Sequence, residues 1–458
     1  MISEYSLIEN KRMIYENNKY SSMIWLLIVA SFIFIAFFIK DIYLIQLSLI
    51  VASFYIIVNP IYIGMPLYWI FAFSTQYYVY SNYSAARILG IALIFGLLIK
   101  VFIENINIMK SKYLVLVAVI ALYTGASVLW SYDSTNAYSD YLSLLINLII
   151  IILFFINSIN TVTLNSLIYV ATLISVFFIL IMIIDSGNLY EGIISGSIDR
   201  ISMDEMQNPG EFGRNLVIYF GCLLFFMKYK SSLYWLLNIL SVAVCGILIV
   251  VSGSRSSIAG LVVIVLLNLI LANRKRKVSY KILVTMTVFF IAVMLFLYSS
   301  EEVLDKILNR YTIESIVTSQ GSRRFVLWEL YSQHVIPENV IFGVGIGGSS
   351  EIAALASTNE VLSIYLKPAH NMYLQLFIQL GIVGFLMFIS LYLNIIVDYF
   401  RSKKEDRITK ELYFYIFIAL LVMAVGEPMF FSKTFWIVLM LLIHPDESEK
   451  EGLIYADT

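Results

Sequence analysis

"IYLIQLSLIVASFYIIVNPIYIGMPLYWIFAFSTQYYVYSNYSAA", residues 42–86, contains no charged side chain. A helix needs roughly 20 apolar residues to cross a hydrocarbon layer of about 30 Å. This run is therefore too long for one span, and Asn59-Pro60 offers a break between two. The whole chain is 60% hydrophobic and 13% charged, whereas about 25% of the residues of soluble domains are charged. We therefore predict an all-α integral membrane protein.

The same criterion predicts about 12–14 transmembrane helices in a single polytopic membrane domain over residues 1–458. The predicted single spans are 22–39, 88–103, 113–130, 212–227, 232–251, 256–273, 282–299 and 371–397. Residues 42–86 and 141–184 are each long enough for two helices, the second run breaking within 157–166, and the paired runs could also be re-entrant. A final hairpin is expected to turn at Glu427-Pro428.

The distribution of lysine and arginine sets the predicted orientation, because these residues favour cytoplasmic loops. Nineteen of the 30 cations fall inside if both termini are cytoplasmic. The segments 185–214 and 301–370 then form external loops. Within the larger loop, residues 301–317 and 322–336 have the apolar spacing of amphipathic helices, which could lie along the outer leaflet as a roof.

The outer cations are biased towards arginine, which accounts for seven of the remaining 11 but only five of the 19 inner ones. Topology signals do not distinguish lysine from arginine, whereas phosphate binding favours the planar, bidentate guanidinium. Arg214 and Arg255 each stand at the outer edge of a span. A plain helix start or a snorkelling anchor would place them there equally well.

"GVGIGG" (343–348) fits the spacing of a dinucleotide-binding loop, but no βαβ pattern surrounds it. A glycine-rich turn that lets the backbone approach another segment explains it better. We expect no metal, because the outer segments lack a metal-ligand motif, and we expect no cofactor. A net charge of −1 gives no reason to predict nucleic-acid binding.

"PAHNMYLQLFIQLGIVG" (368–384) places a histidine where an apolar span begins, and the chain has only three histidines. Histidine is the side chain whose ordinary titration range suits proton transfer near neutral pH. His370 is therefore a candidate proton acceptor on the outer side. A simple helix cap or an interfacial residue is the alternative.

"SGSRSS" (252–257), "RFVLW" (324–328), "VIFGVGIGG" (340–348) and "HNMYLQLFIQLGIVG" (370–384), in this order, resemble the C-terminal signature of the O-antigen polymerase and O-antigen ligase family. The similarity covers roughly residues 200–390. Members of that family transfer glycans from an undecaprenyl pyrophosphate carrier to an acceptor hydroxyl, without metal or nucleotide. The resemblance implies that His370 is the catalytic base and that Arg214, Arg255 and Arg324 hold the donor pyrophosphate.

Further contacts with the sugar or with these four residues are expected from a second group: Glu211, Arg323, Trp328, Asn371 and Tyr373. The implied function is polymerisation of lipid-linked repeat units of an O-antigen, capsule or exopolysaccharide at the outer face of the bacterial inner membrane. A composition rich in Ile, Tyr, Asn and Lys favours polymerase over the alternative, a ligase that transfers glycan to lipid A-core or another acceptor. Expected partners are the lipid-linked glycan and membrane lipids, with a chain-length regulator and a flippase as candidates.

A flippase or another transporter is the alternative function from a different class. Transporters usually carry ionisable residues in the middle of their spans. Here the predicted spans are nearly free of charge, and the charges gather at the outer rim. This distribution favours chemistry at the membrane surface over transport.

Overall fold

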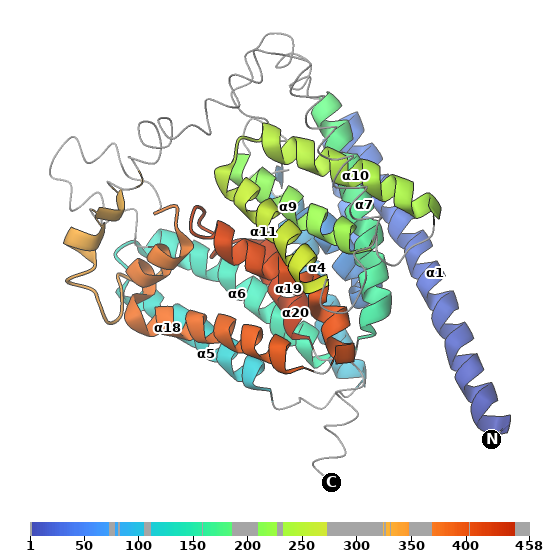
Figure 1. Ribbon diagram of the computed structural model, residues 1–458, viewed down its shortest axis with the longest axis horizontal. Helices are drawn as coiled ribbons and strands as arrows, with labels where there is room; N and C mark the ends of the chain where they lie inside the picture. The colour runs from blue at the N-terminus through green and yellow to red at the C-terminus, as the bar shows by residue number, and fades with distance from the viewer. Residues whose placement is uncertain are drawn as a thin grey trace. The chain divides into compact units, whose positions relative to one another are not determined.

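The computed structural model describes residues 2–72, 78–80, 83–104, 111–157, 159–185, 209–226, 232–272, 324, 327–329, 331–347, 369–402 and 404–444. Nearly all regular structure in these residues is helical (Figure 1). A hairpin of two short antiparallel strands, β1 (Tyr78–Tyr80) and β2 (Tyr83–Ser84), is the exception among them. Among the described residues, six helices are long and apolar enough to cross a membrane. The chain is therefore an all-α, multi-pass integral membrane protein, as predicted.

The chain divides into two compact units, and the first comprises residues 1–109, 153–178 and 444–458. Its helices are α1 (Ile2–Ile39), α2 (Ile42–Val58), the π-helix η1 (Pro60–Gly64), α3 (Met65–Ala72), α4 (Ala85–Glu104) and much of α7 (Thr161–Asp185). The side chain of Asp41 caps α2 by accepting from the backbone N–H groups of Tyr43 and Leu44. The predicted break is confirmed, because α2 ends at Val58, and Asn59 then caps η1.

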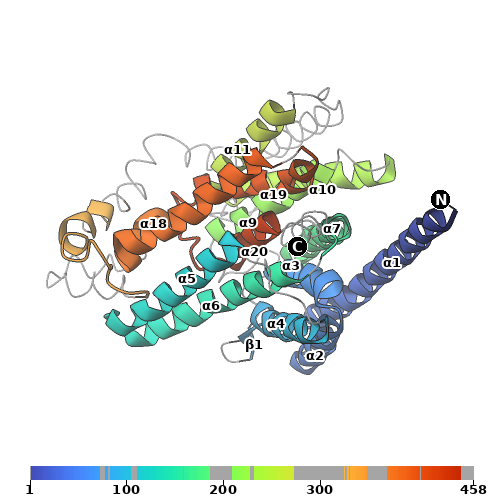
Figure 2. The same cartoon turned by 90° about the horizontal axis from the view of Figure 1, so that it is seen from below.

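The second unit comprises residues 110–152 and 179–443. Its helices are α5 (Lys112–Ser127), η2 (Val128–Trp130), most of α6 (Ser134–Ile156), α9 (Pro209–Phe226), α10 (Ser232–Val251), α11 (Arg255–Ala272), η4 (Tyr331–Val335), α18 (Met372–Arg401), α19 (Lys404–Met423) and α20 (Lys433–Ile443). Figures 1 and 2 both show α5 alongside α18. Every residue from Phe212 to Phe226 is buried, so α9 is enclosed by protein rather than by lipid.

The remaining predicted breaks also fall at helix ends. The run 141–184 divides between α6, which ends at Ile156, and α7, which begins at Thr161. The final hairpin turns between Met423 and Lys433, around Glu427-Pro428 as predicted. The helices after Asn59, η1 and α3, have only 5 and 8 residues, which is short for a full span. The predicted span 282–299 and the amphipathic segment 301–317 lie outside the described residues.

The helix α18 is broken at Gly381, whose φ of 63° is left-handed. The segment 340–345 fills the break: the N–H groups of Val344 and Gly345 donate to the carbonyls of Ile378 and Gln379 at 3.0 and 2.9 Å. In return, Ile382 donates to the carbonyl of Val340 at 2.8 Å. Backbone groups that the break removes from the helix are thereby satisfied by another segment, as a low-dielectric environment requires.

Three of the four glycines of "GVGIGG" make this close approach possible. Gly343, Gly345 and Gly347 all have positive φ. A Cβ on Gly343 would lie 2.4 Å from the backbone of Gln379, and one on Gly345 would lie 2.5 Å from Cα of Ser131. The prediction of a glycine-rich turn that permits close backbone contact is confirmed.

Candidate functional site

Three chain turns of the second unit meet at one end of its helices. They are the start of α9, the turn between α10 and α11 (residues 252–254) and the turn between α19 and α20 (residues 424–432). A Cβ on Gly213 would lie 2.4 Å from Oγ of Ser257, so α9 packs closely against the start of α11. Likewise, a Cβ on Gly260 would lie 2.4 Å from Sδ of Met423, which places the end of α19 against α11.

Arg214 is buried where these turns meet. Its Nη2 lies 3.0 Å from Oε1 of Glu211, one turn earlier in α9, and its Nη1 lies 3.5 Å from Oε2 of Glu427. Its Nε is buried as well and has no hydrogen-bond partner among the described residues. Buried polar groups are nearly always hydrogen-bonded. A buried guanidinium with an unused N–H group can donate to one more anionic oxygen.

Glu427 is held by hydroxyl groups as well as by Arg214. The Ser256 hydroxyl donates a short hydrogen bond to Oε1 of Glu427, and the Ser254 hydroxyl lies 3.4 Å from the same oxygen. Burial raises the pKa of the Glu427 carboxyl above its ordinary value, and the nearby Glu211 adds to the increase. Arg214 and the two serines act in the opposite direction. Burial is the largest of these causes, so the net direction of the shift is upward.

The other two predicted arginines adjoin the same turns. Arg324 donates from Nη1 to the carbonyl oxygen of Gly426 at 3.0 Å, next to Glu427. Arg255 is the first residue of α11, is partly buried, and stands between Ser254 and Ser256. The hydroxyls around Arg255 bond within the protein: Ser252 to the carbonyl of Ile249, Ser257 to Ser254, and the other two to Glu427.

His370 directly precedes Asn371, the residue before α18, and is partly exposed. The cap of this helix is Asn371, whose Oδ1 accepts from the N–H groups of Tyr373 and Leu374 at 3.0 and 3.1 Å. The alternative that the His370 side chain caps the helix therefore does not hold, since Asn371 performs that role. The backbone of His370 has a φ of 49°, a conformation that is uncommon for residues other than glycine.

The start of α18 is bonded to the turn that carries Glu427. The N–H of Met372 donates to the carbonyl of Ala424 at 2.9 Å, and the Tyr373 hydroxyl donates to the carbonyl of Leu421 at 2.7 Å. Three of the predicted residues, Arg214, Arg324 and Tyr373, thus contact α19 or the turn that follows it. Arg323 lies outside the described residues.

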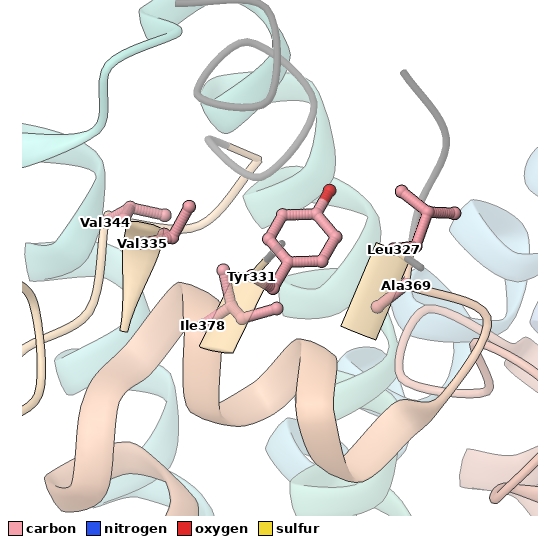
Figure 3. Close-up of a cluster of buried hydrophobic side chains, with 6 residues drawn as sticks. All are labelled: Leu327, Tyr331, Val335, Val344, Ala369 and Ile378. Carbon is pink, nitrogen blue, oxygen red and sulfur yellow. The ribbon is translucent and has the colours of Figure 1, made fainter. Parts of the chain in front are cut away.

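The segment 327–335 packs its apolar face on the start of α18. Leu327, Tyr331 and Val335 are buried in one cluster with Val344, Ala369 and Ile378, and Figure 3 shows the Tyr331 ring in the middle of the group. Trp328 is partly buried against this cluster and donates from Nε1 to the carbonyl of Ala369 at 2.7 Å. The predicted apolar face of residues 322–336 is confirmed for Tyr331 and Val335, while Phe325 lies outside the described residues.

Sequence reasoning identified Glu427 only as part of a turn. It is the single charged residue between Glu411 and Lys433. A lone carboxylate in an apolar hairpin was the signal that could have identified it. A charged group among apolar residues needs a partner of opposite charge or a hydrogen-bond donor. Only the fold shows that the partner is Arg214, 213 residues away in the chain.

The described residues therefore define a multi-pass membrane protein with a buried charged cluster at one end of its helices, and the turn that carries Glu427 is bonded to the start of α18, close in sequence to His370. Residues 239–389 match the family model described as O-antigen ligase (Wzy_C), which confirms the resemblance to the O-antigen polymerase and ligase family. The matched segment contains Arg255, Arg324, Trp328 and His370, whereas Arg214 and Glu427 lie outside it. No curated protein matches the chain. The description of this model implies, for the matched segment, a glycan-transferring enzyme in general.

Proposed function

We propose that the protein polymerises oligosaccharide repeat units linked to undecaprenyl pyrophosphate, at the outer face of the bacterial inner membrane. The reaction is a glycosyl transfer without a metal ion. His370 removes the proton of the acceptor hydroxyl, and Arg214, Arg255 and Arg324 hold the donor pyrophosphate. Both termini are cytoplasmic in this proposal.

The observation that carries the proposal is the unused Nε donor of Arg214. This donor is buried, and it belongs to a guanidinium whose other nitrogens already contact Glu211 and Glu427. A planar guanidinium matches the oxygens of a phosphate group, with charge-assisted hydrogen bonds. A phosphate oxygen would satisfy the remaining donor.

The charge of the cluster bears on how an anion could enter. With both carboxyls ionised, Glu211 and Glu427 outweigh Arg214 and would repel a pyrophosphate. Burial raises the pKa of the Glu427 carboxyl, so this group takes up a proton more readily than a free carboxyl does. Uptake of a proton by Glu427 would leave the Arg214 charge opposed by Glu211 alone. Arg255 at the start of α11 and Arg324 at Gly426 add positive charge on the adjoining turns.

The chemistry requires no group that the chain lacks. The acceptor oxygen forms a bond to the anomeric carbon while the bond from that carbon to the phosphate oxygen breaks. The pyrophosphate departs with the bonding electrons, and the acceptor proton moves to His370. Fixed guanidinium groups stabilise the charge that grows on the leaving group, and a positioned base contributes about 10²–10⁴-fold.

Transfer of a finished glycan to lipid A-core or another acceptor is the second candidate function. The specific observation in its favour is the description of the matched family model, O-antigen ligase. The two reactions share the donor and differ in the acceptor. Both would use the site in the same way.

A deletion strain distinguishes the two functions through its glycan profile. Loss of a polymerase leaves single repeat units on the cell surface, whereas loss of a ligase leaves intact polymer on the lipid carrier. Complementation with the His370→Gln variant provides the matched control, because it restores the protein without the proposed base. A deletion strain whose glycans stay unchanged would contradict both candidates.

A further inference from the structure

The backbone of His370 is held in an uncommon conformation. Its φ of 49° is left-handed, which side chains other than glycine rarely adopt. Such conformations persist where neighbouring structure fixes them. The residues on both sides of His370 therefore have to be restrained.

The C-terminal side is restrained by α18 itself. Asn371 caps the helix, and the N–H of Met372 donates to the carbonyl of Ala424 at 2.9 Å. These bonds orient the chain after His370.

The N-terminal side is restrained by Trp328. Its indole Nε1 donates to the carbonyl oxygen of Ala369 at 2.7 Å, which is at the short end of the range for an N–H···O bond. The carbonyl of Ala369 and the N–H of His370 belong to one planar peptide group. A hydrogen bond to that oxygen therefore restrains the orientation of this peptide plane. The φ of His370 is the rotation about its N–Cα bond that sets this plane relative to the rest of the residue.

Trp328 is itself well anchored. The neighbouring Leu327, Tyr331 and Val335 are buried in the cluster that also contains Ala369 (Figure 3). One turn earlier, Arg324 donates to the carbonyl of Gly426. Trp328 therefore contacts the residue before His370, and Arg324 contacts the turn that carries Glu427.

We propose that Trp328 is a positioning residue for His370, acting through the hydrogen bond from its indole to the Ala369 carbonyl. This rests on the proposed role of His370 as the base. A ring that only stacks on a sugar would need no such bond. The two roles therefore predict different consequences when the N–H alone is removed.

The test is the Trp328→Phe variant, which keeps an aromatic ring and removes the donor. We expect kcat for extension of lipid-linked repeats by purified protein in nanodiscs to fall about 10- to 100-fold, with KM nearly unchanged, since small misplacements of catalytic groups have effects of this size. The matched control is Trp69→Phe, which removes an indole donor to Thr172 at 3.2 Å in the other unit. It should leave kcat unaltered.

The double variant with His370→Gln separates the proposal from the proposed function. If Trp328 acts through His370, Trp328→Phe should have no further effect once His370 is glutamine. A Trp328→Phe enzyme within twofold of wild type, beside a severely impaired His370→Gln enzyme, would overturn the positioning role and leave the function standing. The positioning role would also be overturned if the losses in kcat from Trp328→Phe and His370→Gln multiplied in the double variant. A Trp328→Phe enzyme that changed only in KM would overturn it as well. A fully active His370→Gln enzyme would overturn both proposals.

Discussion

The two ends of α18 are each associated with an ion pair, and the pairs differ in distance and surroundings. At the C-terminal end of α18, Nζ of Lys112 lies 2.7 Å from Oδ2 of Asp398, and the two side chains are 53% and 36% exposed. At the turn bonded to the helix start, Arg214 and Glu427 are 3.5 Å apart, with exposures of 5% and 9%. The closer pair is the one that solvent screens.

The difference in burial suggests that the two ion pairs have different roles, one structural and one functional. An exposed ion pair contributes little to stability, because water and salt weaken it. A buried pair has a desolvation cost that its attraction often fails to offset, so its presence is weak evidence for a stabilising role. We infer that the charges near the start of α18 are kept for chemistry, whereas Lys112 and Asp398 tie α5 to α18.

The largest contrast between the two ends should appear in their accessibility. In a background without Cys222 and Cys245, we expect a cysteine at Ser349, a position outside the described residues, to react with an impermeant thiol reagent applied to spheroplasts. A cysteine at Ser402, which follows the end of α18, should not react. The opposite labelling pattern would place the proposed site in the cytoplasm and contradict the proposed orientation.

At the start of α18, His370→Gln should lower glycan extension by about 10²–10⁴-fold, since glutamine keeps a hydrogen-bonding group without useful basicity. The measurement is extension of lipid-linked repeats by the purified variant. Lys112→Gln at the other end is the control and should remain active. Activity of His370→Gln within a few-fold of wild type would shift the search for the base to Glu211.

Exchange of arginine for lysine should distinguish the ends further. Arg214→Lys and Arg255→Lys keep the charge and lose the planar fork, so activity should fall by about 10²-fold, the effect of losing one donor to a developing charge. The same should hold for Arg324→Lys to a smaller degree, because Arg323 could substitute. The reverse exchange, Lys112→Arg, should be tolerated. Normal polymer from Arg255→Lys would reduce that residue to an interfacial anchor.

The buried carboxyl should also make stability depend on pH. Because the folded pKa of Glu427 is raised, the folded state holds its proton where the unfolded state has lost it. Its contribution to the unfolding free energy is therefore present below the unfolded pKa of about 4.3 and is lost as pH rises through the folded value. Thermal unfolding in detergent should show this decline for wild type, and Glu427→Gln should remove it. Equal pH slopes in the two proteins would contradict the raised pKa.

The smallest effect is expected at the exposed pair. Lys112→Ala should change the unfolding free energy by about 0.2–1 kcal/mol, and by less at high salt. Glycan transfer should stay normal. A loss well above this range would mean that the hydrogen bonds from Lys112 and Tyr113 to Asp398 hold the two helices together more strongly than their exposure suggests.

The sequence by itself determined the class of fold and most of the helix boundaries. Hydrophobic length and the scarcity of charge select membrane helices, because lipid offers no partners to backbone polar groups. Asn59-Pro60, the polar run 157–166 and Glu427-Pro428 interrupt the runs for local reasons, and the breaks fall there. The glycines of "GVGIGG" could likewise be assigned to a close backbone approach, since only glycine adopts positive φ at low cost.

Only the tertiary structure decided what these segments approach. The partner of the glycine turn is the break in α18, the partner of Glu427 is Arg214, and the partner of the Trp328 indole is the Ala369 carbonyl. Asn371, rather than His370, caps α18. The pattern of apolar, polar and glycine residues in a segment predicts its conformation and its burial, because both depend largely on the residues of that segment. Contacts between distant residues depend on how several helices pack at once, and no single segment encodes that arrangement.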